Sequence, residues 1–120
     1  MNLPGLTLMA AAAVLVGVLA GCAQTGASAP SPVATSAVDL PPSYRFVPAD
    51  ISVRVGTTVT WTNNDHFSHS VQFMDGGPPS EPLAMEPGQV VTFTFEHPGL
   101  YQYQCHLHPQ NMRGSVTVTP

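Results

Sequence analysis

The residues of this 120-residue chain with the richest chemistry gather in one short segment near its end. Cys105, His106, His108 and Met112 offer a thiolate, two imidazoles and a thioether within eight residues. Soft sulfur donors combined with imidazole favour copper, which also heads the affinity order of the divalent first-row metals. The segment therefore predicts a copper site.

A second part of the chain must complete that site. Two histidines and one cysteine in a plane, with a weak axial methionine, form the blue-copper arrangement, and we expect one of the two histidines to come from elsewhere in the chain. His69 is the natural donor, because it begins a stretch of alternating polar and apolar residues, His69-Ser70-Val71-Gln72-Phe73. We expect one copper ion per domain, exchanging between Cu(I) and Cu(II), with His69, Cys105, a histidine of the segment and Met112 as its ligands.

The beginning of the chain has the features of an export signal. Residues 6–20 form an uncharged run of 15 residues. A transmembrane helix needs about 20 such residues, whereas a run of this length suits the apolar core of a secretory signal. The run leads into Leu19-Ala20-Gly21-Cys22, which resembles the bacterial lipobox. The resemblance implies a lipoprotein signal peptide over residues 1–21 and a lipid on Cys22, which would hold an exported protein at the outer face of the membrane or in the periplasm.

The cysteine count supports a metal at Cys105. The chain has two cysteines, so acylation of Cys22 leaves Cys105 without a partner. An unpaired thiol in an oxidising compartment is a liability unless something occupies it. Pairing of Cys22 with Cys105 remains open only if Cys22 carries no lipid.

Composition limits the remaining possibilities. Three Arg, no Lys and a net charge of −4 argue against nucleic-acid binding, which needs a clustered basic face. Residues 22–38 combine small and polar residues with proline and carry no charge, which predicts a flexible tether. Residues 39–120 remain for one small domain, which we expect to be monomeric.

The domain has the texture of a β protein. Polar and apolar residues alternate through several short stretches, which is the period of half-buried strands: 51–55, 58–62, 69–73, 91–95, 101–104 and 115–119. A further strand is expected over 44–47. Turn formers such as Pro87-Gly88 and Pro98-Gly99 separate these stretches. The pattern predicts an all-β sandwich of about seven to eight strands.

The domain also resembles the cupredoxins, in particular the plastocyanin, pseudoazurin and amicyanin group. The resemblance is carried by three stretches of the chain: Phe46-Val47-Pro48, the run Val59 to Asp65 followed by His69, and the run Pro98 to Cys105 with its Cys-x2-His-x3-Met spacing. It implies a Greek-key sandwich with the ligand loop closing one end, and the copper ligands His69, Cys105, His108 and Met112. It also implies a non-enzymatic carrier of single electrons between redox protein partners. Around the ligands we expect Asn64 and Ser70, the latter standing where plastocyanin-like proteins usually have Asn.

Two other functions remain open. Copper delivery, storage or tolerance would use the same donors, with His66, Met74 and Met85 as additional ones. Delivery, however, needs a site from which the ion can exchange. A copper oxidase would need a second cluster between domains, and zinc hydrolysis would need an open position and usually a carboxylate base. His97 has the character of an ordinary surface residue, and so do His66 and His106 unless they form a second, weaker site or respond to pH near neutrality.

Overall fold

The computed structural model describes residues 17, 21, 30–75, 77 and 79–120. Every regular element in this part of the chain is a strand, so the predicted all-β class is confirmed. The strands are β1 (Val33–Ala34), β2 (Ala37–Leu40), β3 (Asp50–Arg54), β4 (Thr57–Asn63), β5 (His69–Phe73), β6 (Leu83–Met85), β7 (Val90–Phe95), β8 (Gly99–Gln104) and β9 (Arg113–Thr119).

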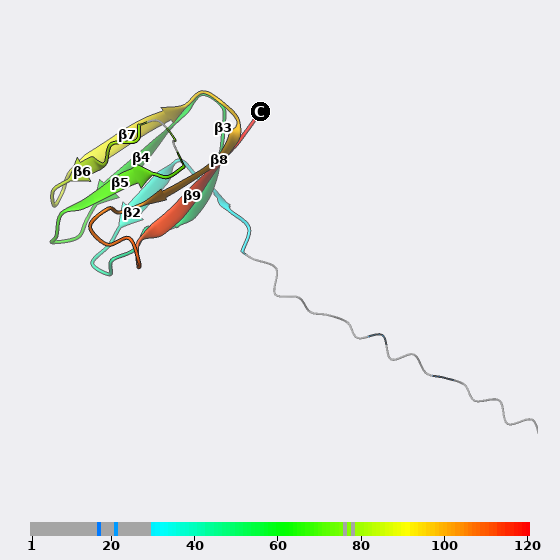
Figure 1. The fold of residues 1–120 in the computed structure, drawn as a ribbon, viewed down its shortest axis with the longest axis horizontal. Helices are drawn as coiled ribbons and strands as arrows, with labels where there is room; N and C mark the ends of the chain where they lie inside the picture. Colours follow the sequence, from blue (N-terminus) through cyan, green and yellow to red (C-terminus); the bar gives the residue numbers. More distant parts are fainter. Residues whose placement is uncertain (1–16, 18–20, 22–29, 76, 78) are drawn as a thin grey trace, which may run out of the picture.

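The strands form two mixed sheets. Six strands follow the order β1-β3-β9-β8-β5-β6, and three follow the order β2-β4-β7. Neighbours that are distant in sequence, such as β3 beside β9, require crossover connections of the kind a Greek-key sandwich has. In Figure 1 the connection between β8 and β9 lies at one end of the domain, while the leading chain and the C-terminus lie at the other.

Aromatic side chains from both sheets fill the space between them. The ring of Trp61 on β4 meets Tyr103 on β8 at 5.5 Å and Phe73 on β5 at 6.1 Å, both edge to face. Such contacts add to the stabilisation that burial already provides. Burial also raises the pKa of Tyr103, whose hydroxyl donates a hydrogen bond to the carbonyl of Ala49.

The sheets begin earlier than the sequence indicated. The predicted tether extended to residue 38, but β1 and β2 occupy part of that segment. The backbone of β2 pairs in parallel with β4, and Val38 and Leu40 are buried in the core. Two apolar side chains alternating with Ala37 and Asp39 are enough for an edge strand, because the neighbouring strand supplies the hydrogen bonds. For residues 33–38 the prediction of a flexible tether is therefore wrong.

The strand predicted over 44–47 is also wrong. A turn closes at Ser43, whose amide donates to the carbonyl of Pro41, and Tyr44 has a φ of 53°. That left-handed conformation cannot continue a strand. Only Val47 pairs, through an isolated bridge in which its amide and carbonyl both bond to Asp39. The segment is a loop, and it carries Tyr44 to the end of the domain where His69 and His108 lie.

The predicted signal peptide, the lipid site at Cys22 and the tether over residues 22–29 lie almost wholly outside the described residues. Within the described part of the chain, no helix has the length and hydropathy required to span a bilayer.

Candidate metal centre

Three of the four predicted ligands meet at one end of the sandwich. His69 is the first residue of β5, and Cys105 directly follows the last residue of β8. His108 lies three residues further along the loop that leads to β9. The ladder between β8 and β9 ends with Gln104 opposite Arg113, so the sheet itself fixes where this loop begins and ends.

The donor atoms have the spacing that a shared ion requires. Nδ1 of His69 lies 3.8 Å from Sγ of Cys105, and Nδ1 of His108 lies 3.7 Å from the same sulfur. All three donor atoms lie within 4.8 Å of one another. Two ligands about 120° apart on one ion, with metal–nitrogen and metal–sulfur bonds of about 2.0 and 2.3 Å, would be about 3.7 Å apart. The spacing of the donors therefore fits a single ion that one sulfur and two nitrogens would share.

Hydrogen bonds within the loop hold the fourth predicted ligand close by. The amide of Cys105 donates to the carbonyl of Met112, and the amide of Met112 donates to the carbonyl of His108, at 3.1 and 3.0 Å. The guanidinium of Arg113 closes the loop from outside by donating to the carbonyl of Pro109 at 2.6 Å. The Met112 side chain is fully buried. The loop is therefore compact, with Cys105 and Met112 at its two ends, next to β8 and β9.

A carboxylate behind His69 orients that ring. Oδ2 of Asp65 lies 2.7 Å from Nε2 of His69, and both side chains are buried. Because Nε2 donates to the carboxylate, Nδ1 keeps its lone pair and faces Cys105, which is the tautomer that a metal needs. The hydrogen bond from His69 lowers the pKa of Asp65, so the carboxylate is held in its charged form. The sequence analysis missed this role, although Asp65 precedes His69 by four residues in a turn.

Within the described part of the chain, Asn64 makes no hydrogen bond to the predicted ligands. Its amide nitrogen donates to Asp39 at 2.5 Å, on the exposed side of the loop. The residue before it has the structural role: buried Asn63 donates to the carbonyls of Phe67 and Met85, and its side-chain oxygen accepts from the amide of Asp65. These bonds shape the turn that presents Asp65 to His69.

Ser70, the other residue expected around the ligands, lies on β5 next to His69. Its buried hydroxyl accepts a hydrogen bond from the amide of His106 at 3.0 Å and pairs with Nδ1 of the same residue at 2.5 Å. The oxygen also lies 3.9 Å from Sγ of Cys105. Ser70 thus ties β5 to the loop that carries three of the predicted ligands, Cys105, His108 and Met112.

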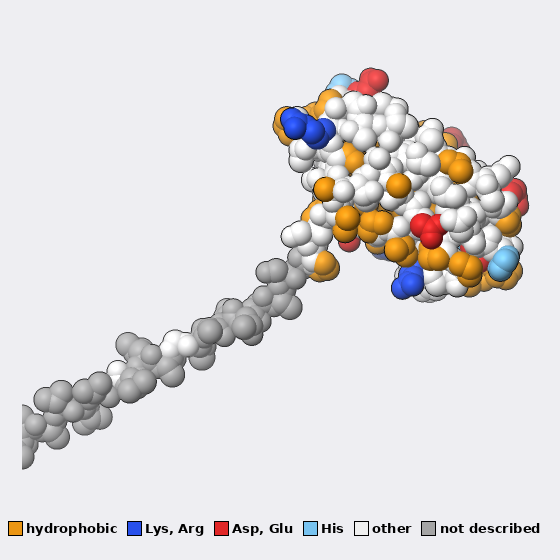
Figure 2. Space-filling view, turned by 180° about the vertical axis from the view of Figure 1, so that it is seen from behind, with side chains coloured by type: hydrophobic (Ala, Val, Ile, Leu, Met, Phe, Trp, Pro, Cys, Tyr) orange, Lys and Arg blue, Asp and Glu red, His pale blue; other side chains and the backbone are white. Residues whose placement is uncertain are grey.

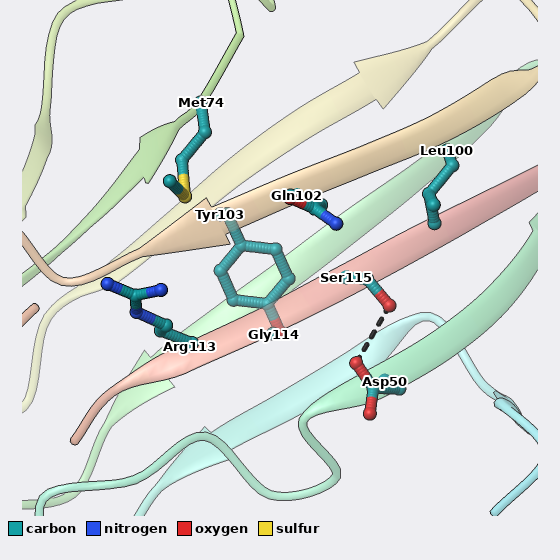
Figure 3. A pocket seen from close by; sticks show the side chains of 8 residues that line it. All are labelled: Asp50, Met74, Leu100, Gln102, Tyr103, Arg113, Gly114 and Ser115. Atoms are coloured by element: carbon teal, nitrogen blue, oxygen red, sulfur yellow. Dashed lines mark hydrogen bonds between the residues drawn. The ribbon is translucent and has the colours of Figure 1, made fainter. Parts of the chain in front are cut away.

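The other two methionines considered, Met74 and Met85, have different surroundings. Met85 is a core residue, paired in register with His69 on the neighbouring strand. Met74 lines a hollow of about 260 Å³ beside β8 and β9, together with Asp50, Leu100, Gln102, Tyr103, Arg113, Gly114 and Ser115. Figure 3 shows the Tyr103 ring reaching across toward Gly114, and the hydrogen bond between Ser115 and Asp50. Among the described residues, His69, Cys105 and His108 form the only group of three or more metal-ligating side chains of this kind.

Comparison with known proteins identifies the family. Residues 39–119 match the model of a family described as copper binding proteins, plastocyanin/azurin family. The chain belongs to this family. The group of donors described above agrees with a family of copper-binding proteins.

Individual relatives agree with that assignment. The chain is 36% identical over 84 residues to chloroplastic plastocyanin of Physcomitrium patens, which covers 62% of this chain and 50% of that protein. It is 36% identical over 77 residues to amicyanin of Paracoccus denitrificans, covering 62% of this chain and 58% of that one. It therefore spans little more than half the length of these two relatives.

Solved structures show the same fold. A purple cupredoxin from Nitrosopumilus maritimus superimposes with a TM-score of 0.64 at 29% identity, over 71% of this chain and all of that one. An oxidized amicyanin mutant gives a TM-score of 0.62 at 35% identity, over 69% of this chain and 80% of that one.

Proposed function

We propose that this protein is a blue-copper carrier of single electrons. In the proposed site, His69, Cys105 and His108 would hold one copper ion, with Met112 as a fourth ligand. The observation that carries the proposal is the pair of Nδ1–Sγ distances, 3.8 and 3.7 Å, within a fold of the plastocyanin/azurin family. Copper, when bound, supplies the one-electron chemistry by exchanging between Cu(I) and Cu(II).

Contacts with the surrounding residues restrict the movement of those donors. His69 is buried and hydrogen-bonded to Asp65, while Cys105 is buried and joined through its backbone to Met112. Donors that are fixed by the sheet and by hydrogen bonds move little when the charge at their centre changes. A site with this construction favours rapid electron exchange over release of the ion, which is why we prefer a carrier of electrons to a copper-delivery protein.

Location and partners form part of the same proposal. The relatives include a plastocyanin described as chloroplastic and an amicyanin. We propose export, attachment to the membrane through a lipid on Cys22, and exchange of electrons with redox protein partners. The leading chain meets the domain at the end away from the β8–β9 loop (Figure 1), so an anchor there would leave the proposed site facing solution.

The test is the visible spectrum. The full chain carrying Cys22→Ser, which leaves Cys105 as its single thiol, is loaded with Cu(II) and compared with the same chain carrying Cys105→Ser. We expect an intense charge-transfer band that a reductant bleaches reversibly and that the Cys105→Ser chain lacks. Colourless protein that binds Cu(I) tightly, or bound copper that exchanges freely in both chains, would reject the carrier and favour copper delivery.

A further inference from the structure

Tyr44 has an unusual backbone for its residue type. Its φ of 53° lies in the left-handed region, and among the described non-glycine residues only Asp75 shares this feature, with a φ of 56°. A bulky aromatic residue rarely adopts this conformation, because its Cβ crowds the neighbouring backbone. Such a conformation persists where the surrounding contacts enforce it, and it is concentrated at functional sites.

The contacts of the Tyr44 ring are with the two imidazoles of the candidate centre. Its centroid lies 4.8 Å from that of His108 and 5.8 Å from that of His69, at interplanar angles of 71° and 90°. The imidazoles are themselves 5.2 Å apart, so three rings meet edge to face. Tyr44 also stacks with Phe67 at 5.8 Å and 23°. The ring thus contacts both Phe67 and the proposed ligands.

The exposed fraction of the side chain decreases from Phe67 and Tyr44 to the proposed ligands. Phe67 is 55% exposed and Tyr44 is 37% exposed, whereas His69 and Cys105 are buried and His108 is half-buried. Two large aromatic side chains, Phe67 and Tyr44, are therefore exposed to solvent beside the proposed ligands. Neither belongs to the main core, so general fold stability does not account for them.

We propose that Tyr44 is the cover of the metal centre: it holds the His108 ring in the ligand plane and keeps small molecules away from Cys105 and from a bound ion. The left-handed backbone is needed because the loop after β2 must turn the ring inward over the two imidazoles. Tyr44 then acts as a positioning residue, because its contacts are with the rings of the proposed ligands His69 and His108. The inference rests on the proposed copper site, although part of its test needs no copper.

The first measurement uses the metal-free chain carrying Cys22→Ser, in which Cys105 is the single thiol. The rate at which a disulfide reagent such as Ellman's reagent modifies Cys105 reports how well the site is closed. Tyr44→Gly retains the backbone conformation and removes the ring, and we expect it to raise the rate by about tenfold or more, because thiol reactivity follows exposure. Tyr44→Phe retains the ring and should react like the parent chain.

Two controls separate the cover from general loosening. Asp75→Gly removes the same kind of backbone strain at the only other such position described, and it should leave the rate unchanged. Thermal unfolding of each variant is followed by circular dichroism, and rates are compared well below every midpoint. A Tyr44→Gly rate equal to the parent rate would overturn the proposal, and so would a Tyr44→Phe rate as high as that of Tyr44→Gly.

The second measurement uses the copper-loaded chains. Azide added to the Cu(II) protein should change the charge-transfer band of Tyr44→Gly and leave the bands of the parent and of Tyr44→Phe unchanged. Equal responses in all three chains would overturn the proposal. Absence of the band from the parent chain would instead reject the blue-copper site, and the thiol rates would still decide whether Tyr44 covers Cys105.

Discussion

Oδ2 of Asp65 lies 2.7 Å from Nε2 of His69, and this hydrogen bond decides which nitrogen of the ring is free to bind a metal. The carboxylate is supplied by a buried turn that Asn63 organises, so the orientation of His69 is built into the chain before any metal arrives. Partners of this kind, lying directly behind a ligand, commonly contribute 10- to 100-fold, in round terms about 1–3 kcal/mol, to metal affinity.

Asp65→Ala should therefore weaken copper binding by about 10- to 100-fold. The imidazole would lose the acceptor that fixes its tautomer and its angle. Competition with a chelator of known affinity measures the change for both Cu(I) and Cu(II). Asn64→Ala is the matched control, because Asn64 is the neighbouring residue and contacts Asp39 instead of the ligands. Equal affinities for the two variants would contradict the role assigned to Asp65.

Acid should destabilise the metal-free protein partly through the same residue. The pKa of Asp65 is lowered in the folded state from its ordinary value of 3.8, chiefly by the hydrogen bond from His69. The charged carboxylate thus contributes stability that is present above about pH 3.8 and is lost as pH falls through the lower folded-state pKa. Urea unfolding at a series of pH values should show a steeper acid loss for the parent than for Asp65→Asn. Parallel curves would rule the contribution out.

Replacing the proposed axial ligand should change the potential and leave the colour in place. Met112→Leu removes a weak sulfur donor that favours the more positive Cu(II) state, so the reduction potential should rise while the Cys105 charge-transfer band persists. Spectroelectrochemical titration measures both quantities. Met85→Leu is the control, since Met85 is equally buried and pairs with His69 through the backbone. Equal shifts in the two variants would mean that Met112 is a core residue only.

Ser70→Ala should loosen the ligand loop. The substitution removes the acceptor of the His106 amide in a part-buried hydrogen bond, and loss of such a bond costs about 0.5–1.5 kcal/mol. Urea unfolding of the metal-free protein measures the loss. Ser68→Ala provides the comparison, because its hydroxyl donates to Glu86 at an exposed position and its removal should have little effect. A loss no larger than that of Ser68→Ala would show that Ser70 does not brace the loop.

Gly114→Ala should destabilise the domain by about 1–3 kcal/mol or more, as overpacking of a rigid site does. A Cβ at this position would clash with the carbonyl oxygen of Ala49 and lie 2.5 Å from the Tyr103 ring, and the first of these is backbone that cannot move aside. Gly56→Ala, where a Cβ meets open space but φ is 88°, isolates the cost of backbone strain. Thermal and urea unfolding should rank Gly114→Ala as the more damaging change, and the reverse order would contradict the clash.

The class of fold and three candidate donors could be predicted from the sequence. Strand periodicity is local, so alternation such as that of Ile51 and Val53 with Ser52 is visible without a structure. His69, Cys105 and His108, which the structure brings together, were equally visible because few side chains have their chemistry, whereas Met112 as a ligand stays a prediction.

The surroundings of those donors, in contrast, depend on the folded chain. Asp65 could not be told from Asn64 in the sequence, because which of two adjacent side chains points inward depends on the turn that Asn63 closes. β2 was missed because its stability comes from pairing with β4, more than twenty residues away. Tyr44 was expected in a strand, yet its ring lies on His69 and His108. Each depends on contacts between segments distant in sequence, which local patterns do not encode.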